Sequence, residues 1–589
     1  MGAWWRSAVV YQVYIRSFAD ASGDGEGDIG GLRSRLPYLR DLGVDAIWIT
    51  PWYPSPMRDG GYDVADYRDI DPRYGTLADA RGLIAAAHAA GLRVIIDVVP
   101  NHTSSAHPWF REAVASPRGS AARERYHFRE GRGPRGVEPP NNWRSVFGGL
   151  AWTRAPDPAA LGGDGAAGGE GPKQWYLHLF DEAQPDLNWD NPEVREDFER
   201  TLEFWLEMGV DGFRIDVADL LLKAPGLPDV PERSETISRA DDPAAWNPAD
   251  HPYENQPGLH EIYRRWRAIA DAAGREVVFC GEIHLPARGI AGLLRPGELQ
   301  TAFNFDFALQ PWDAAALRAS IDRTLESHGE VGAPATWVVG NHDLPRPTYR
   351  YGRFRPGGEQ REDSARPWDA WERIEAADLA AGLRRARAVA LLYLALPGSA
   401  YVYQGDELGL PEVLDLPPEV RQDPTFRRSR GADVGRDGAR IPIPWSGDRP
   451  PFGFGPEGSR PWLPQPSGWS ALSVEAQAAD PESALQLYRA ALQLRRTHPA
   501  FGDGLAGQAF RWLESPPGTL VFRRGDAHAS GIVCAINLSA ENLPLPPNSR
   551  VLVASGPLDS AAPDGRPGIL PAETAVWLEA GLEVGEWPS

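Results

Sequence analysis

Cysteine is nearly absent from this chain of 589 residues, which contains Cys280 and Cys534 alone. Two cysteines so far apart provide no disulfide framework, and they exclude a metal site built on cysteine ligands. No stretch reaches the roughly 20 apolar residues that a membrane-spanning helix needs, so we expect no membrane association. The opening residues MGAWWRSAVVYQVYIRSF lack the basic and apolar regions of a signal peptide, which predicts a cytoplasmic protein.

Positive charge is also in short supply. The formal net charge is −21 and the isoelectric point is near 5.1. Nucleic acids and anionic membrane surfaces attract proteins of positive potential, so neither is an expected partner. Aromatic residues, in contrast, are abundant, with 22 Trp and 17 Tyr. Flat aromatic rings suit the faces of sugars, although most such side chains lie in protein cores.

Short runs rich in β-branched residues recur along the chain, and helical patterns such as residues 77–91 and 383–396 lie between several of them. The runs occupy residues 8–15, 44–50, 92–99, 210–217, 276–283, 301–307, 335–342 and 398–405. Strands and helices that alternate eight times predict a parallel sheet closed into a (β/α)₈ barrel. Such barrels hold their active sites at the carboxyl ends of the strands.

Two segments depart from this alternation. Residues 101–181 are too long for a loop and are rich in Pro, Gly and aromatic residues, which predicts an inserted domain over the barrel mouth. From residue 501 to 589 the pattern changes to alternating strands without helices, which indicates a C-terminal antiparallel β-sandwich. The barrel itself is then predicted from residues 1–100 and 182–500.

The stretch GFRIDVADL, residues 212–220, places Arg214 and Asp216 in an otherwise apolar strand. Residues two apart on a strand point to the same face, so the two side chains lie together. Taken alone, the pair is equally compatible with a structural ion pair. Glu282 and Asp343 end two further predicted strands, and three carboxyl groups at one rim suit hydrolysis of a glycosidic bond.

This chemistry needs one ionised carboxylate as nucleophile and one protonated carboxyl group as acid. We expect Arg214 to keep Asp216 ionised. The apolar neighbours of Glu282 favour its protonated, proton-donating form.

Four segments, DVVPNH (97–102), GFRIDVA (212–218), GEIHL (281–285) and GNHD (340–343), resemble in order the signature regions of the α-amylase family, glycoside hydrolase family thirteen. The resemblance extends over essentially the whole chain. It implies that Asp216 is the nucleophile, Glu282 the acid/base, and Asp343 the carboxylate that grips and distorts the sugar ring.

The same resemblance implies roles for the side chains around the carboxylates. His102 and His342 would hydrogen-bond sugar hydroxyls, and Arg214 would orient the nucleophile. The chemistry requires no cofactor.

Other segments resemble one part of this family, the α-glucosidases and oligo-1,6-glucosidases. They are QPDLNW (184–189), GGYDVADYRDI (60–70) and RDGARIPIPW (436–445). In such enzymes an Asp and an Arg, here matched to Asp63 and Arg440, pair beyond the terminal glucose and limit the enzyme to exo-action. Tyr62 would stack on that glucose, and Phe147 would wall the same subsite unless it is ordinary packing within the inserted domain.

The predicted activity is therefore a retaining α-glucosidase acting on maltose and short malto-oligosaccharides, with transglucosylation as a side activity. Val217, after the nucleophile, favours oligo-1,6-glucosidase instead, whereas the longer matches resemble maltose-acting enzymes. A dedicated α-transglucosylase shares the same motifs. A non-catalytic relative, like the amylase-like heavy chains of amino-acid transporters, is the remote alternative. We expect a monomer or a homodimer.

Oxygen-bearing side chains alternate in DASGDGEGD, and this spacing is typical of a loop that binds Ca²⁺. The candidate ligands of this structural Ca²⁺, or Mg²⁺, are Asp20, Ser22, Asp24, Glu26 and Asp28. Relatives in the resembled family have such a site here. An acidic turn without metal is the alternative.

Overall fold

The structure is a computed structural model, and part of the chain is left undescribed. The described residues are 3–156, 173–231, 251–354, 377–501, 510–525, 531–547, 549–558, 568–580 and 587.

Eight parallel strands form the central sheet, in the spatial order β10-β11-β1-β2-β3-β7-β8-β9. They are β1 (Val9–Val13), β2 (Ala46–Ile49), β3 (Arg93–Val98), β7 (Gly212–Ile215), β8 (Val278–Gly281), β9 (Thr301–Ala302), β10 (Thr336–Val338) and β11 (Ser399–Tyr403). Each strand falls within one of the eight predicted runs, so the predicted barrel is confirmed. Nearly all of the strand residues are buried, as expected for a parallel sheet covered by helices.

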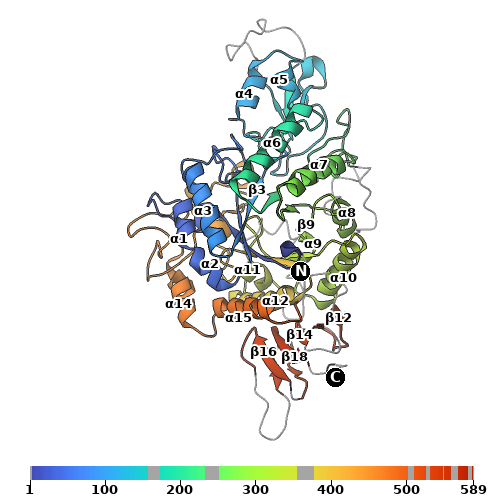
Figure 1. Ribbon diagram of the computed structural model, residues 1–589. Helices are drawn as coiled ribbons and strands as arrows, with labels where there is room; N and C mark the ends of the chain where they lie inside the picture. The colour runs from blue at the N-terminus through green and yellow to red at the C-terminus, as the bar shows by residue number, and fades with distance from the viewer. Residues whose placement is uncertain are drawn as a thin grey trace.

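Helices surround this sheet in Figure 1. The larger ones are α2 (Leu36–Leu42), α3 (Leu77–Ala89), α6 (Pro192–Met208), α7 (Leu259–Ala272), α8 (Ala287–Leu293), α10 (Ala314–Glu330), α12 (Leu379–Ala395) and α15 (Ala484–Thr497). Their ends follow local chemistry. Helix α3 starts with a capping box between Thr76 and Asp79. Helix α6 starts at Asn191, whose side chain accepts from the Glu193 amide, and ends at Gly209 with φ 106°.

The insertion between β3 and α6 carries its own small antiparallel sheet, at the top of Figure 1. Its strands are β4 (Phe128–Glu130), β5 (Trp152–Arg154) and β6 (Gln174–Leu177), and helices α4 (Pro108–Ala115) and α5 (Ala121–Glu124) precede them. Trp143, Trp152 and Trp175 pack together with Leu227 and Val230 from the segment that follows β7. The insertion therefore rests on a loop at the carboxyl ends of the barrel strands, over the mouth.

The C-terminal region lies at the opposite end of the molecule (Figure 1). Its main antiparallel sheet has the order β12-β13-β14-β18-β16, and β15 pairs with β17 separately. The bounds are β12 (Phe510–Trp512), β13 (Thr519–Arg524), β14 (Gly531–Asn537), β15 (Leu543–Pro544), β16 (Arg550–Ala554), β17 (Ile569–Leu570) and β18 (Thr574–Ala580). One face packs on α12, where the Trp577 indole donates to the Leu391 carbonyl at 3.0 Å. The other face is covered by β15 and β17.

In the part of the chain that the structure describes, no helix combines the length and apolar composition needed to cross a membrane.

Candidate active site

One guanidinium organises the carboxylates at the barrel mouth. Arg214 in β7 is fully buried and forms ion pairs with Asp97 at 2.7 Å, Asp216 at 2.6 Å and Glu282 at 2.7 Å. The register of the sheet explains the convergence, because Asp97 in β3 and Cys280 in β8 are the Cα partners of Arg214 on its two sides. Asp216 and Glu282 follow the last residues of β7 and β8, so both reach the same cation.

Backbone hydrogen bonds lock these two carboxylates at the rim. The Asp216 amide donates to the Val98 carbonyl at 2.9 Å, and the Glu282 amide donates to the Ile215 carbonyl at 2.8 Å. Between them Val217 has φ 38°, a conformation that β-branched residues rarely adopt. Its amide donates to Glu282 Oε2 at 3.1 Å. The turn after the expected nucleophile therefore provides a hydrogen bond to the expected acid/base.

Arg214 lowers the pKa of Asp216, as expected from the sequence, but other groups act against it. Burial raises the pKa of Asp216 well above its usual value, and Glu282 and Asp97 raise it further, while Arg214 only partly offsets them. Burial also raises the pKa of Asp97 to about 6. Three carboxyl groups around one cation cannot all ionise without excess negative charge, so the cluster retains protons. One carboxylate and one carboxylic acid are what glycoside cleavage needs.

Asp343 stands on the other side of the pocket and is ionised. Its Oδ1 accepts from Arg436 at 2.8 Å and from Arg440 at 2.9 Å, and its amide donates to Asn341. Burial raises the pKa of this carboxyl group, but His342, Arg436 and Arg440 outweigh that effect and hold the pKa well below its usual value. Asp343 can therefore accept hydrogen bonds from sugar hydroxyls.

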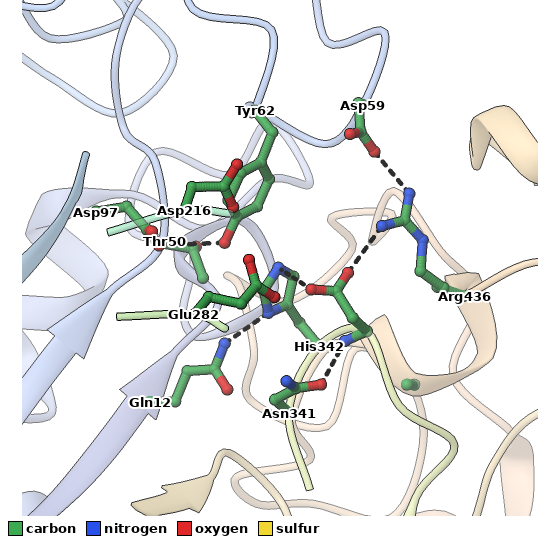
Figure 2. A network of polar contacts seen from close by, with 12 residues as sticks. Gln12, Thr50, Asp59, Tyr62, Asp97, Asp216, Glu282, Asn341, His342 and Arg436 are labelled. Carbon is green, nitrogen blue, oxygen red and sulfur yellow. Dashed lines mark hydrogen bonds and ion pairs between the residues drawn. The ribbon is translucent and has the colours of Figure 1, made fainter. Parts of the chain in front are cut away.

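His342 and Tyr62 form a stacked pair beside this carboxylate. Their ring centroids are 5.1 Å apart and the planes lie within 9°. The Tyr62 hydroxyl donates to Asp97 at 3.1 Å, and Gln12 hydrogen-bonds His342 Nδ1 at 2.7 Å, as Figure 2 shows. Burial lowers the pKa of His342 well below its usual value, while the neighbouring Asp343 carboxylate acts in the opposite direction.

The expected pair between Asp63 and Arg440 is wrong: the structure does not bring these side chains together. Asp59 Oδ1 instead accepts from Arg436 Nη2 at 2.6 Å, drawn as a dashed line in Figure 2. Arg436 also donates to Asp343 at 2.8 Å and to Asp423 at 2.5 Å. Both members of the observed pair lie four residues before the expected ones: Asp59 directly precedes the segment of residues 60–70, and Arg436 opens the segment of residues 436–445.

Asp63 and Arg440 each hydrogen-bond the backbone of a loop that contributes a residue to the pocket. Asp63 is fully buried, and its Oδ1 accepts from the Ser55 hydroxyl at 2.9 Å and from the Asp59 amide at 3.1 Å. Arg440 ends the short helix η10 (Asp437–Arg440) and donates to the His342 carbonyl at 3.0 Å as well as to Asp343. Asp63 thus shapes the loop that carries Asp59, and Arg440 shapes the loop that carries Asp343.

His102 lies on the side of the inserted domain. It is buried, it forms a β-bridge with Asp186, and its Nε2 contacts the Gln184 amide at 3.1 Å. Asp186 accepts the Lys223 ammonium at 2.8 Å, and both of these side chains are fully buried. This ion pair ties the segment after β6 to the segment after β7. Sequence reasoning missed Lys223, whose only signal was a lysine in the apolar stretch LLLKAP.

Phe147 lies close to the charged wall of the pocket, by which we mean Asp59, Arg436 and Asp343. Arg436 lies over its ring at 5.0 Å from the centroid, and Phe180 packs against it edge-on at 5.6 Å. The ring is 9% exposed, so it both packs within the inserted domain and contacts the wall. Phe147 therefore packs within the inserted domain, and its role at the glucose subsite stays a prediction.

The loop of residues 20–28 does not present the expected metal ligands. Asp20 accepts from the amides of Gly23 and Gly25, and Ser22 donates its hydroxyl to Asp20. Glu26 pairs with Arg16 at 2.6 Å. Asp24 accepts the Glu26 amide, while Asp28 caps α1 (Ile29–Ser34) through the Gly31 amide. Among the described residues no group of three His, Cys, Asp or Glu side chains is placed to hold a metal ion. In this conformation the donor set does not fit, and a bound Ca²⁺ stays a prediction.

A family model described as the alpha amylase catalytic domain matches residues 12–504. The chain belongs to the alpha-amylase family. This confirms the family expected from the four sequence segments. A probable alpha-glucosidase of Rhizobium meliloti (strain 1021) is 37% identical over 547 residues, covering 91% of this chain and 90% of that protein. An oligo-1,6-glucosidase of Parageobacillus thermoglucosidasius is 33% identical over 527 residues, covering 84% of each.

Solved structures of family members share the whole architecture. The alpha-glucosyl transfer enzyme XgtA superposes with a TM-score of 0.80 at 34% identity, covering 99% of this chain and 100% of that one. The trehalulose synthase MutB of Pseudomonas mesoacidophila MX-45 gives 0.79 at 30% identity, covering 98% and 100%. The relatives thus include enzymes named for hydrolysis and enzymes named for glucosyl transfer.

Proposed function

We propose that this family member is a retaining, exo-acting α-glucosidase that releases α-glucose from the non-reducing ends of maltose and short malto-oligosaccharides. The observation that carries the proposal is the link between Asp59, Arg436 and Asp343. These residues come from the loop after β2, the segment after β11 and the loop after β10, and Arg436 joins the two carboxylates at 2.6 and 2.8 Å. A charged wall beside the catalytic carboxylates leaves room for one terminal sugar and rejects a chain that continues past it.

In this mechanism Asp216 attacks the anomeric carbon and forms a covalent glucosyl intermediate. Glu282 gives its proton to the departing oxygen and, as a carboxylate, then activates the incoming water. Asp343 accepts hydrogen bonds from the ring hydroxyls and strengthens them as the sugar distorts. Arg214 contacts both Asp216 and Glu282, so it can stabilise whichever of the two is ionised at each step.

Two inversions at one carbon predict retention of configuration. Proton NMR of maltose hydrolysis, recorded before mutarotation, should show α-glucose as the first anomer released. The appearance of β-glucose first would overturn the assignment of Asp216 as nucleophile. Release of long oligosaccharides from starch, or a rapid fall in its viscosity, would overturn exo-action.

A second candidate is a dedicated α-transglucosylase, favoured by the likeness to XgtA and MutB, whose names describe glucosyl transfer and trehalulose synthesis. Water and a sugar hydroxyl compete for the same intermediate, so the catalytic residues are common to both functions. Product analysis at low and high maltose concentrations separates them. Hydrolysis as the main activity predicts that glucose exceeds transfer products at low millimolar maltose, and that transfer products grow with concentration.

The most detailed part of the proposal is the preferred glycosidic linkage, α-1,4 or α-1,6. Val217 lies after the nucleophile with its side chain 7% exposed, at a position expected to affect tolerance of α-1,6 bonds. We propose maltose as the better substrate. Initial rates on maltose, isomaltose, sucrose and trehalose, measured side by side, test this choice, and a higher kcat/KM on isomaltose would replace it by oligo-1,6-glucosidase.

A further inference from the structure

A cavity of about 240 Å³ lies at the end of the barrel opposite the candidate active site. Its barrel residues are Ser7, Asp45 and Gly398, which come within two residues before β1, β2 and β11. These strands are neighbours and parallel, so their first residues share one edge of the sheet. The catalytic carboxylates follow the last residues of strands, and the cavity is therefore a separate site.

Three arginines line this cavity: Arg495 and Arg496 from α15, and Arg524 from β13 of the C-terminal sheet. Arg495 donates to the carbonyls of Leu394 and Gly398 at 2.5 Å, of Ser7 at 3.1 Å and of Leu396 at 3.4 Å, and Arg524 donates to the Ala395 carbonyl at 2.6 Å. The two guanidiniums thus bind carbonyl groups at and just beyond the C-terminal end of α12. These contacts account for both terminal nitrogens of Arg495, but a carbonyl group carries no net charge to balance a guanidinium.

Among the described residues, none of these three guanidiniums has a carboxylate within ion-pair distance. Arg495 is 8% exposed and Arg524 is 3% exposed, and the Nε of each is buried without a hydrogen-bond partner. Charged side chains this deeply buried are normally paired. Asp45 lines the same cavity but accepts from the Val9 amide, so three cations face one carboxylate.

The electrostatics agree with this geometry. Burial and, to a smaller extent, the neighbouring Arg495 lower the pKa of Arg524 to about 9. Burial likewise lowers the pKa of Arg495, and with the opposing effect of Asp45 included the pKa is about 10. A bound anion with two negative charges would balance the positive charges of Arg495 and Arg524.

We propose that this cavity binds a phosphate group, either as the free ion or carried by a small molecule, at the junction of the barrel and the C-terminal sheet. Guanidinium groups match the tetrahedral oxygens of phosphate in geometry as well as in charge. The volume admits a phosphate with a few attached atoms. The ligand would hold α15, the amino ends of the strands and β13 together, so it acts on stability rather than on the chemistry at the mouth.

The test is titration calorimetry of the full-length protein with inorganic phosphate at constant ionic strength. Arg496→Gln is the informative variant, because Arg496 is exposed and its loss should not unfold the protein. Arg511→Gln is the matched control, since Arg511 is an exposed arginine of the same C-terminal sheet and lies outside the cavity lining. We expect one site with a Kd of about 1 mM or below, weakened about tenfold or more by Arg496→Gln and unchanged by Arg511→Gln.

Thermal unfolding provides an independent measurement. Phosphate stabilises proteins in general by exclusion from their surfaces, and that effect does not saturate. Specific binding predicts a saturating rise in Tm for the wild type and for Arg511→Gln, and a smaller rise for Arg496→Gln. Arg524→Lys, which keeps the charge but not the planar fork, should fall between them.

Glycerol 3-phosphate distinguishes the two sources of the phosphate group. Tighter binding than inorganic phosphate identifies a phosphorylated small molecule, and weaker binding identifies the free ion; either result supports the site. Absence of saturable heat with both probes, or an equal response of wild type and Arg496→Gln, would overturn the proposal.

Discussion

The two sides of the candidate pocket are built in different ways. The guanidinium of Arg214 meets its carboxylates at strand ends, where sheet register fixes which residues are neighbours. The opposite wall, where Arg436 meets Asp59 and Asp343, is assembled from three loops. Strand ends tolerate no shift in register without loss of the sheet, whereas loops can place either of two similar residues in contact. In the function proposed above, the strand ends would carry the catalytic groups and the loops would select the substrate.

The largest effect is expected on the side of the pocket built from strand ends, where removal of the proposed nucleophile should abolish nearly all activity. Asp216→Ala should leave the fold intact and lower kcat by about four orders of magnitude or more, because no other group can form the covalent intermediate. Steady-state rates on maltose, with circular dichroism as the control for folding, measure this. Retention of a tenth of the wild-type turnover would show that Asp216 has another role.

Removal of a buried charge should have the next largest effect, on stability. Lys223→Met leaves Asp186 ionised and unpaired at a position where both side chains are fully buried. We expect the free energy of unfolding to fall by about 3–5 kcal/mol, since breaking a buried pair strands a charge. Urea denaturation tests this. The double variant Lys223→Met/Asp186→Asn should recover part of the loss, and a double variant no more stable than Lys223→Met would contradict the ion-pair explanation.

The loop-borne wall can be tested with two aspartates from one loop. Asp59→Asn removes the charge of one of the three carboxylate partners of Arg436. It should lower kcat/KM on maltose by about 100-fold, mainly through KM, because binding of the terminal glucose is weakened. Asp63→Asn keeps the hydrogen bonds of a buried side chain and should change kcat/KM less than about fivefold. A double-mutant cycle of Asp59→Asn with Arg436→Gln should show strong coupling. Equal losses from Asp59→Asn and Asp63→Asn would erase the distinction between the two positions.

The contrast between strands and loops also explains what could be predicted from sequence. Hydrophobic periodicity located all eight barrel strands, and the carboxylates at their ends followed from the geometry of such barrels. The pairing of Asp59 with Arg436 could not be derived in this way. The segments MRDGGYD and GRDGAR each contain two candidates four residues apart, and only the folded loops determine which pair meets. The upward effect of burial on the pKa of Asp216 likewise could not be derived from sequence, because it depends on surroundings that lie far away along the chain.

Because Asp63 is buried, its carboxyl group should make the free energy of unfolding depend on pH. Burial raises the pKa of Asp63 from 3.8 to about 6, so folding takes up a proton between these values. The stability that this proton uptake confers is present below about pH 4 and is lost as the pH rises through 6. Asp63→Asn removes this dependence. We expect the variant to gain stability relative to wild type between pH 4 and 7, by at most about 3 kcal/mol. A difference that stays constant over this range would show that Asp63 is ionised in the folded protein.

The smallest effect is expected from removal of divalent metal. The loop of residues 20–28 has the alternating oxygen donors of a Ca²⁺ site, yet its carboxylates already have partners: Asp20 accepts two backbone amides, and Glu26 pairs with Arg16. A metal would have to displace these contacts, which costs much of what its binding provides. We expect EDTA to lower Tm by no more than about 2 °C and to leave kcat/KM within about a factor of two. Arg16→Gln sharpens the test because it frees Glu26: stabilisation by added Ca²⁺ should then increase. A Tm loss above about 5 °C in EDTA, restored by Ca²⁺, would show that the wild-type loop rearranges around a metal. In that case the sequence of this loop, like the sequences of the loops that carry Asp59 and Arg436, would be compatible with more than one set of contacts.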